Sequence, residues 1–453
     1  MTTAGRTEPM ARARTVRDPV WGNIRLDRTA AAVLDTAEFQ RLRRVKQLGF
    51  ADLVYPGAVH TRFLHALGVY HLTGRAIELL RVRGDLDRLD AGERAEVPLV
   101  RLAALLHDVG HYAFSHAMEE VARGSIPGDH EEVAASFLTS GAIESALAEQ
   151  GPEAAARITA LIRGTSTHPL QGLVSGSLDL DKIDYLTRDS FFCGVPYGSV
   201  DVARLLDALC LARETEGAPL EVGVTEKGLS ALESLLFSKY QMFRNVYWHH
   251  TVRAATVVFR RLVETALAVG LLRPGELAGP TDEDLLGLLE ARWKSISRSM
   301  PDLAQVPALL EALSGRRLPK RAVELFGDRL PAGIARWMIE DPALVRRVEE
   351  RLAGEWGLPG GSLFLDYPAY PDMLRLRLLV VRRGSEVRRL TSAGEKGLID
   401  LPRLSASLHH SARVFRIFTL QPVDKKDPTP LLSLLEASGS EVEGRLREER
   451  ALY

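Results

Sequence analysis

Apolar residues recur on one helical face along most of this chain, which predicts a mainly helical protein. The segments Asp27–Leu48 and Leu67–Val82 both show this repeat. Residues Val97–Leu106 are apolar on almost every side, so we expect that helix to lie at the centre of the fold. Further helices are expected at Glu131–Leu138, Glu153–Arg163, Leu178–Asp189, Gly228–Leu272 (with one break) and Leu285–Trp293, the last after a Thr281–Asp284 capping box.

Near residue 360 the pattern changes from helical to partly alternating. The segments Leu374–Arg382 and Val414–Leu420, with Val387–Leu390 between them, are typical of strands. Pro430–Glu449 is typical of a polar helix. These features indicate a small lobe of mixed helix and strand after the helical part of the chain.

Clusters of Pro and Gly predict linkers at 273–280, 315–319 and 357–361. We therefore expect a mainly α fold class with four successive parts. They are a mobile tail at 1–14, a helical core at 15–265, a helical extension at 266–360 and a small C-terminal α+β lobe at 361–453.

Composition and charge are those of an ordinary globular protein and narrow the function only slightly. The 453 residues carry a net charge of -1, whereas nucleic-acid binders usually show a basic excess, so such a partner is not favoured. No apolar run reaches about 18 residues, so we expect no membrane span, and residues 1–14 lack the apolar core of a secretory signal. Two cysteines form no disulfide framework, and a cytoplasmic location is the simplest expectation.

Candidate chemistry gathers in the first third of the chain, where seven of the twelve histidines precede residue 131. His107 and Asp108 directly follow the apolar helix, and an adjacent imidazole and carboxylate can ligate one divalent metal. His65 and Asp181 would complete a mixed nitrogen and oxygen set. Spacing alone does not bring the four together, because a single histidine is more often a packing residue and a single aspartate more often a cap.

Several ordered segments around these residues resemble one known family. They are Phe39–Arg43 with Lys46–Gly49, Phe63–Val69, His107–His111 with Phe114–His116, and Asp181–Tyr185 with Arg188–Asp189. The pattern is similar to that of the HD-domain phosphohydrolases, and in particular to their deoxynucleoside triphosphate (dNTP) triphosphohydrolase branch. The resemblance covers about residues 15–265 well and the C-terminal lobe loosely, and it implies an HD-domain helical core.

The resemblance implies hydrolysis of a dNTP to a deoxynucleoside and inorganic triphosphate. It assigns one divalent metal, which could be Mn, Fe, Zn, Ni or Mg, to His65, His107, Asp108 and Asp181. Such an ion could orient an α-phosphate oxygen and lower the pKa of a bound water. An additional Mg²⁺ could bind together with the nucleotide.

The family implies catalytic roles for a second set of residues. His111 and His130 would contact the α-phosphate, and His116, supported by Glu119, would act in attack or in protonating the leaving oxygen. His111 would lie on the same side as His107 if the helix continues beyond it. The family often has Asp at the position of Glu119, which changes the reach of the carboxylate. A capping or surface role remains the alternative for His130.

The resemblance also implies five substrate-binding residues. Arg62 and Lys182 would lie near the phosphates, which cations stabilise. Tyr185 would pack on the deoxyribose where a 2′-hydroxyl would clash, and Asp189 and Gln47 would bind the 3′-hydroxyl. The plain alternative is that the ring is half-buried core and that Asp189 pairs with the neighbouring arginine.

A regulatory site is implied by three further matches. Asp35, Gln40 and Arg43 resemble residues that bind an activating guanine nucleotide, GTP or dGTP, between subunits of related enzymes. Such a site implies a homo-oligomer, either a dimer or a tetramer. The alternative is an ordinary solvated helix face in which Asp35 and Arg43 share a charge environment.

Two other functions stay open. One is an HD phosphohydrolase or phosphodiesterase acting on an alarmone or a cyclic nucleotide, although those substrates carry ribose. The other is a nucleotide-sensing regulator or a single-stranded nucleic-acid binder, for which the interleaved rings and cations of Tyr240–Arg253 are suited. Within that segment Arg244 and Arg253 could contact nucleotide, whereas the adjacent His249 and His250 diverge by about 100° on a helix and are not assigned to the metal.

Overall fold

The computed structural model describes residues 14–121, 125–295, 305–331, 336–368, 377–384, 386–390 and 401–453. The helices are α1 (Arg28–Leu34), α2 (Ala37–Arg41), α3 (Arg62–Val82), α4 (Ala91–Leu106), α5 (His116–Glu119), α6 (His130–Leu138), α7 (Gly141–Leu147), α8 (Ala154–Ile162), α9 (Leu180–Cys193), α10 (Val202–Ala208), α11 (Leu229–Met242), α12 (His250–Ala268), α13 (Asp282–Ser295), α14 (Val306–Ser314), α15 (Trp337–Glu340), α16 (Pro342–Glu355), α17 (Leu401–Ala412), α18 (Thr429–Glu436) and α19 (Gly439–Arg447). The strands are β1 (Arg14–Asp18), β2 (Gly22–Leu26), β3 (Leu209–Ala212), β4 (Glu221–Thr225), β5 (Lys320–Phe326), β6 (Leu363–Asp366), β7 (Leu378–Val381), β8 (Val387–Leu390) and β9 (Val414–Thr419).

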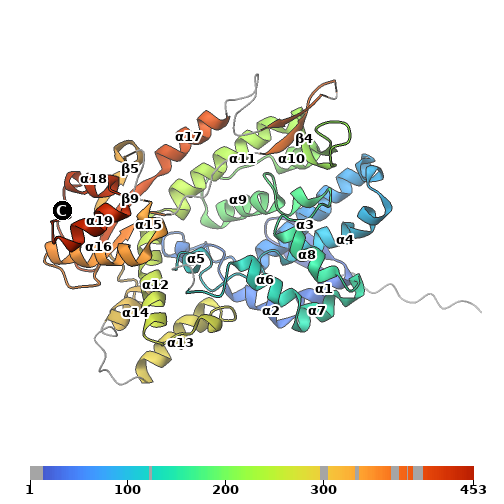
Figure 1. Cartoon of the computed structure of the whole chain (residues 1–453). Helices are drawn as coiled ribbons and strands as arrows, with labels where there is room; N and C mark the ends of the chain where they lie inside the picture. Colours follow the sequence, from blue (N-terminus) through green and yellow to red (C-terminus); the bar gives the residue numbers. More distant parts are fainter. Residues whose placement is uncertain are drawn as a thin grey trace, which may run out of the picture.

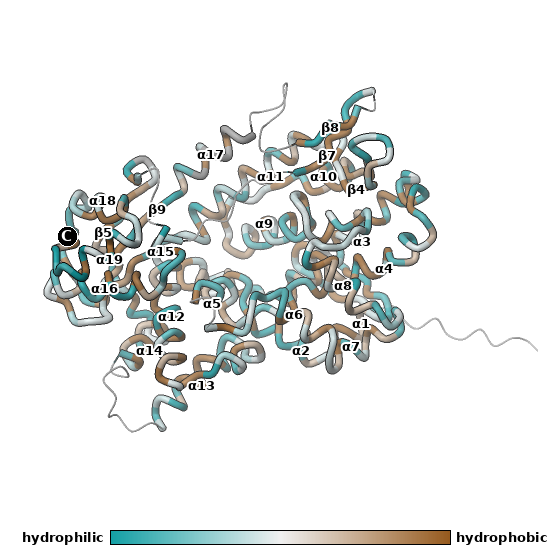
Figure 2. The backbone as a smooth tube through the Cα atoms, viewed as in Figure 1, coloured by the Kyte–Doolittle hydropathy of each residue, from teal (hydrophilic) through white to brown (hydrophobic). Residues whose placement is uncertain are grey.

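The fold is mainly helical, as predicted, and its principal core lies where α3 packs against α4 and α9. The apolar helix expected at the centre is α4, whose last eight residues are almost all fully buried. It begins earlier than the apolar pattern, because Asp90 and Glu93 form a capping box at its first turn. Teal and brown alternate along most helices, as helices with one face against a core require (Figure 2).

Local capping breaks two of the predicted helices. The expected helix over 27–48 is split, because the Thr36 hydroxyl accepts the Phe39 amide and starts α2 as a separate element. In the same way Ser438 forms a capping box with Glu441 and divides the predicted 430–449 helix into α18 and α19. The break expected in Gly228–Leu272 is confirmed as a π-helical turn at Phe243–Tyr247 between α11 and α12.

The C-terminal lobe has a core of its own, and of the three strands predicted for it the described residues place one, β9, in the sheet of the lobe. β9 lies between β5 and β6 in an antiparallel sheet, and α16, α18 and α19 supply the residues that cover it. This lobe lies at one end of the molecule, and α12 runs between it and the other helices (Figure 1). No helix within the described ranges has both the length and the apolar composition needed to cross a membrane.

A second sheet joins distant parts of the sequence. β4 pairs with β3 on one side and runs parallel to β7 on the other, and β8 forms the far edge. Two strands after residue 361 therefore extend a sheet of the helical core, while the division of the chain at that residue stays a prediction. Residues 1–13 of the expected tail and residues 374–376 of the expected strand lie outside the described residues, and Arg14 belongs to β1 rather than to a tail.

Candidate active site

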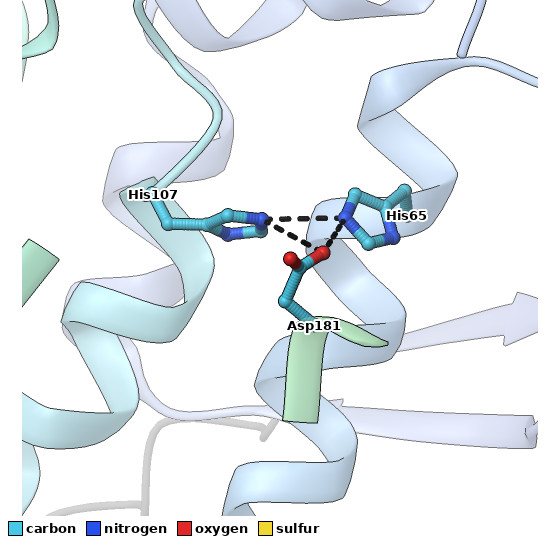
Figure 3. Close-up of side chains that lie close together, drawn as sticks. All are labelled: His65, His107 and Asp181. Atoms are coloured by element: carbon cyan, nitrogen blue, oxygen red, sulfur yellow. Dashed lines mark hydrogen bonds and ion pairs between the residues drawn. The ribbon is translucent and has the colours of Figure 1, made fainter. Parts of the chain in front are cut away.

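Four side chains from three helices converge beside the central core. His65 lies in the first turn of α3, His107 and Asp108 follow the last turn of α4, and Asp181 lies in the first turn of α9. The His65 Nε2 atom is 2.9 Å from Asp181 Oδ1 and 3.2 Å from His107 Nε2. Figure 3 shows the three side chains pointing toward one another. His107 Nε2 lies 3.3 Å from Asp108 Oδ1. The structure thus brings together all four predicted ligands.

The hydrogen bonds behind the two imidazoles fix where their protons lie. His65 Nδ1 donates to Asp184 Oδ2 at 2.8 Å, and His107 Nδ1 donates to the Ala104 carbonyl at 2.9 Å. A carboxylate and a carbonyl only accept, so both Nε2 atoms carry lone pairs in the neutral rings. Two such nitrogens 3.2 Å apart share a cation, which is either a proton on one of the rings or a metal ion that replaces it.

The spacing also suits a metal ion. Ligand atoms about 2.1 Å from an ion and at right angles to each other are about 3 Å apart, close to the separations found here. Burial lowers the pKa of His65, but hydrogen bonds with Asp181 and Asp184 outweigh it and raise the value to about 10. For Asp108, a carboxyl group, burial acts in the opposite direction and raises the pKa. The charges of Arg62 and the neighbouring histidines outweigh burial and hold this pKa well below its usual range. Burial raises the pKa of Asp181 too, but His107 and His65 hold it well below its usual range, so two ionised carboxylates face the imidazoles and the residues fit a divalent metal.

Asp184 contacts a proposed ligand, His65, and is a residue of the site that the sequence analysis did not assign. It is fully buried and accepts hydrogen bonds from the Trp21 indole and from Arg188, whose Nε lies 2.8 Å away. Burial raises its pKa, but Arg188 outweighs this and lowers the value to about 2. Gly68 makes room for this carboxylate, because a Cβ there would overlap Asp184 Oδ1. The signal was present, since Asp184 lies one helical turn after Asp181.

A second cluster joins His111, His116, Glu119 and His130. Glu119 Oε1 is 2.9 Å from His130 Nδ1, and its Oε2 is 3.1 Å from His116 Nδ1. The rings of His111 and His130 stack with centroids 4.0 Å apart and planes 10° apart. The Nδ1 atoms of both rings lie beside the same Glu119 oxygen, at 3.3 Å for His111 and 2.9 Å for His130, so this group could exchange a proton or hold a cation.

The chain reaches this arrangement through a turn and not through a continued helix. α4 ends at Leu106, so the helix does not continue to His111, and the condition under which His111 would share a helix face with His107 is not met. Gly110 lets the turn approach the start of α6, because a Cβ there would overlap the His130 carbonyl and the Ala134 amide. His130 begins α6, as expected, and its ring comes to rest on His111.

Burial and charge shift the pKa values of His111 and His130 in opposite directions. Burial and the nearby Arg62 lower the pKa of His111 to about 4, so this imidazole is neutral near pH 7. Burial also lowers the pKa of His130, but the Glu119 carboxylate outweighs it and raises the value. Burial raises the pKa of Glu119, yet its hydrogen bonds with the histidines hold it far below the usual range.

A cavity of about 730 Å³ opens over both clusters, a size typical of small-molecule sites. The predicted residues Gln47 and Arg62 line it. Arg62 donates through Nη1 to Asp108 Oδ2 at 2.5 Å and through Nε to Ser115 Oγ at 2.7 Å. Its buried Nη2, like Gln47 Oε1, has no hydrogen-bond partner among the described residues, so both atoms are available to a ligand.

The predicted sugar-binding residues line the same cavity. Tyr185 and Asp189 lie on α9, and the Asp189 carboxylate accepts the Tyr247 hydroxyl at 2.6 Å and meets His60 Nε2 at 2.8 Å. The alternative that Asp189 pairs with Arg188 is wrong, because Arg188 turns to Asp184 and to the carboxylate at position 18.

Two lysines near the cavity differ from the sequence prediction: Lys182 contacts protein groups, and Lys239 was not predicted to line the site. The Lys182 ammonium donates to the Gly176 carbonyl at 3.0 Å and to Asp179. Lys239, which the sequence analysis missed, lines the cavity, and burial together with Lys182 lowers its pKa to about 8. The feature of the sequence that could have indicated Lys239 is the neighbouring segment Tyr240–Arg253, in which aromatic and basic residues are interleaved.

The two arginines suggested for nucleotide contact are both engaged with protein. Arg244 donates to the Tyr240 hydroxyl at 2.9 Å. Arg253 lines the cavity but pairs with Glu120 at 2.5 Å and with Asp366 at 2.7 Å. Neither guanidinium is therefore left without a protein partner.

The three residues of the suggested regulatory site lie near one another on the surface. Arg43 Nε donates to Gln40 Oε1 at 2.8 Å, and its guanidinium lies 3.6 Å from the centre of the Phe63 ring. Asp35 is 61% exposed and pairs with Arg14 rather than with Arg43. Gln40 and Arg43 therefore share one face, as expected.

Comparison with known proteins agrees with this arrangement. Residues 62–189 match the HD domain and residues 200–395 match the HD-associated region. A protein of Methanocaldococcus jannaschii, MJ1154, is 30% identical over 418 residues, which are 91% of this chain and 80% of that protein. The Dictyostelium discoideum homologue of the deoxynucleoside triphosphate triphosphohydrolase SAMHD1 is 30% identical over 247 residues, which are 52% of this chain and 46% of that protein.

A solved structure extends the likeness to nearly the whole fold. The crystal structure of a hypothetical protein from Aquifex aeolicus is 27% identical, with a TM-score of 0.66 over 90% of this chain and 96% of that one. The matched HD domain holds His65, His107, Asp108 and Asp181. The chain belongs to the HD-domain phosphohydrolases, with an HD domain followed by an HD-associated region.

Proposed function

We propose that this protein hydrolyses dNTPs to a deoxynucleoside and inorganic triphosphate. The observation that carries the proposal is that one cavity is lined by the His65, His107, Asp108 and Asp181 set and by Tyr185. A phosphate bound at the metal ligands would leave its sugar within reach of that ring. The relative named as a dNTP triphosphohydrolase supports this choice among HD phosphohydrolases, although it aligns with only about half of this chain.

Each polar group in the cavity has a use in this reaction. A divalent ion held by the four ligands would supply charge to an α-phosphate oxygen and acidify a bound water. Arg62, through its unpartnered Nη2, binds a phosphate oxygen, and Lys239 neutralises further phosphate charge. Lys182, which holds Asp179 beside the ligand Asp181, could turn toward the phosphates.

Proton transfer falls to the second cluster. His116 has a side chain that is 73% exposed at the cavity and is held by Glu119. It protonates the leaving 5′-oxygen, while His130 and the neutral His111 contact the α-phosphate. The carboxylate of Glu119 keeps the charge of the histidines balanced.

Recognition of the sugar rests on α9 and its neighbours. Tyr185 fills the space beside C2′, and Asp189, oriented by its two hydrogen bonds, accepts the 3′-hydroxyl together with Gln47. These contacts favour deoxyribose over ribose, because a 2′-hydroxyl would meet the ring.

Regulation by nucleotide belongs to the same proposal. Asp35, Gln40 and Arg43 bind a guanine nucleotide, GTP or dGTP, at a contact between copies of the chain. Their surface position outside the cavity and the stacking of Arg43 on Phe63 support this role. The active protein would then be a homo-oligomer.

Product analysis tests the proposed reaction directly. Protein loaded with Mn²⁺ is incubated with each dNTP and each NTP, and products are separated by anion-exchange chromatography. Inorganic triphosphate from dNTPs is the expected result. Hydrolysis of cyclic nucleotides or alarmones without dNTP turnover would instead favour the alternative phosphohydrolase. Absence of any turnover would favour a nucleotide-sensing role.

A further inference from the structure

One carboxylate from the HD-associated region reaches into the wall of the active site. Asp282 is the first residue of α13 and is 4% exposed. Its Oδ1 accepts the Phe114 amide at 2.7 Å, and its Oδ2 accepts the Lys46 amide at 3.0 Å. Both acceptors are therefore used to tie together two backbone segments that are far apart in sequence.

The first of these segments is strained. Phe114 and Ser115 have φ angles of 57° and 47°, a left-handed conformation that residues with a side chain rarely adopt. Such a conformation persists where the surroundings hold it, and the bond from Asp282 to the Phe114 amide is one such restraint. His116, the proposed acid, directly follows this turn.

The second segment is connected to the same turn. Ser115 Oγ donates to the Lys46 carbonyl at 3.3 Å and accepts Arg62 Nε at 2.7 Å. Arg62 in turn holds Asp108, and Gln47 follows Lys46 into the cavity. A shift of either backbone segment therefore moves groups that face the substrate.

Arg41 makes a second connection between the segment before α13 and the turns of the active site. Arg41 donates to the Pro280 carbonyl at 3.3 Å and also to the carbonyls of Val109 and His111 at 2.9 and 2.7 Å. The start of α13 is thus attached to both turns that carry catalytic histidines.

We propose that Asp282 is a positioning residue, which holds the Phe114–Ser115 turn against the Lys46 backbone so that Arg62 and His116 face the reacting phosphate. This inference rests on the proposed function for its effect on rate. It gives the HD-associated region a part in catalysis that the HD domain alone would lack.

Two substitutions and a matched control test the proposal. Asp282→Ala removes both acceptors, and Asp282→Asn keeps one, because an amide offers a single oxygen. Asp284→Ala is the control: Asp284 caps the same helix through Thr281 at 2.6 Å, and its side chain is 51% exposed. Stability, measured by thermal unfolding, is compared in all three.

The expected result for Asp282→Ala is a fall in kcat/KM of about 100-fold with metal content unchanged, in which kcat falls because His116 shifts and KM rises because Arg62 and Gln47 shift. Asp282→Asn falls between this variant and the wild type, and Asp284→Ala keeps the wild-type kcat. A wild-type kcat in Asp282→Ala, or an equal loss in Asp284→Ala, would overturn the proposal. If Asp282→Ala does not fold, the comparison between Asp282→Asn and Asp284→Ala decides.

Hydrogen exchange gives a readout that is independent of activity. The amide of Phe114 should exchange faster in Asp282→Ala, which removes its acceptor, and at the wild-type rate in Asp284→Ala. An unchanged rate in Asp282→Ala would refute the restraint itself. If the wild type hydrolyses no dNTP, the proposed function fails, whereas faster exchange at Phe114 would still support the restraint.

Discussion

His65 and Asp184, which are 119 residues apart in the sequence, are joined by a 2.8 Å hydrogen bond from the imidazole Nδ1 to the carboxylate Oδ2. That bond directs the other nitrogen of His65 toward His107 and Asp181. The substitution Asp184→Asn should therefore lower metal affinity by about 10- to 100-fold, because the amide group cannot accept from all the donors around it. Titration with Mn²⁺, followed by measurement of bound metal, checks this. Wild-type affinity in the variant would contradict it.

Removal of a proposed ligand should abolish metal binding and leave the helices in place. Asp108→Ala takes away a carboxylate that Arg62 and two histidines surround. We expect loss of both metal and dNTP hydrolysis, with a helical circular dichroism spectrum like that of the wild type. Full activity in a metal-free Asp108→Ala protein would refute the site.

The free energy of unfolding should fall as the pH drops from 6.5 to about 4, because His111 stays neutral in the folded protein over that range. Burial lowers its pKa from 6.5 to about 4, so the unfolded chain takes up a proton there before the folded chain does. The stabilising contribution is complete above pH 6.5 and is lost progressively toward pH 4, in total about 3 kcal/mol. Urea unfolding of the wild type and of His111→Gln across this range should show a smaller pH dependence for the variant. Equal slopes would disprove the assignment.

Discrimination between deoxyribose and ribose should depend on the ring of Tyr185. Tyr185→Ala opens the space where a 2′-hydroxyl would fall, so NTP hydrolysis should rise relative to dNTP hydrolysis. The ratio of kcat/KM for dATP and ATP measures the effect. An unchanged ratio would count against this role.

Activation by guanine nucleotide should depend on Arg43. Low concentrations of GTP or dGTP should accelerate hydrolysis of a different dNTP in the wild type and not in Arg43→Ala. Arg44→Ala is the matched control, since Arg44 is the adjacent arginine with a side chain that is 62% exposed. Equal activation of both variants would remove the regulatory site from this position.

Periodicity predicted the elements that position the active site, because burial of one helix face leaves a clear trace in the sequence. The ends of α3 and α4 were predicted at the residues observed, but their starts were predicted at Leu67 and Val97 instead of Arg62 and Ala91, and α9 was predicted to end at Asp189 instead of Cys193. The polar caps at Thr36 and Ser438 were harder to anticipate, since a single local hydrogen bond there outweighs a continuous apolar pattern.

Convergence of the ligands followed from resemblance and not from spacing. Nothing in the distance between positions 65 and 181 requires their side chains to meet. The contact of Asp282 with Phe114 depends on the packing of separate segments and leaves no signal in the sequence. The spacing of Asp184 from Asp181, in contrast, indicated a shared helix face but not the contact with His65. Lys182 was predicted to lie near the phosphates, but its ammonium donates to Asp179, three residues earlier in the sequence. The resemblance did not indicate this local hydrogen bond.

The parallel pairing of β4 with β7 has a consequence for any attempt to isolate the catalytic core. Truncation after residue 360 would remove β7 and β8 and leave the N–H and C=O groups of β4 uncovered along one side. An open strand of this kind recruits other chains, so the shortened protein should aggregate unless that edge is redesigned.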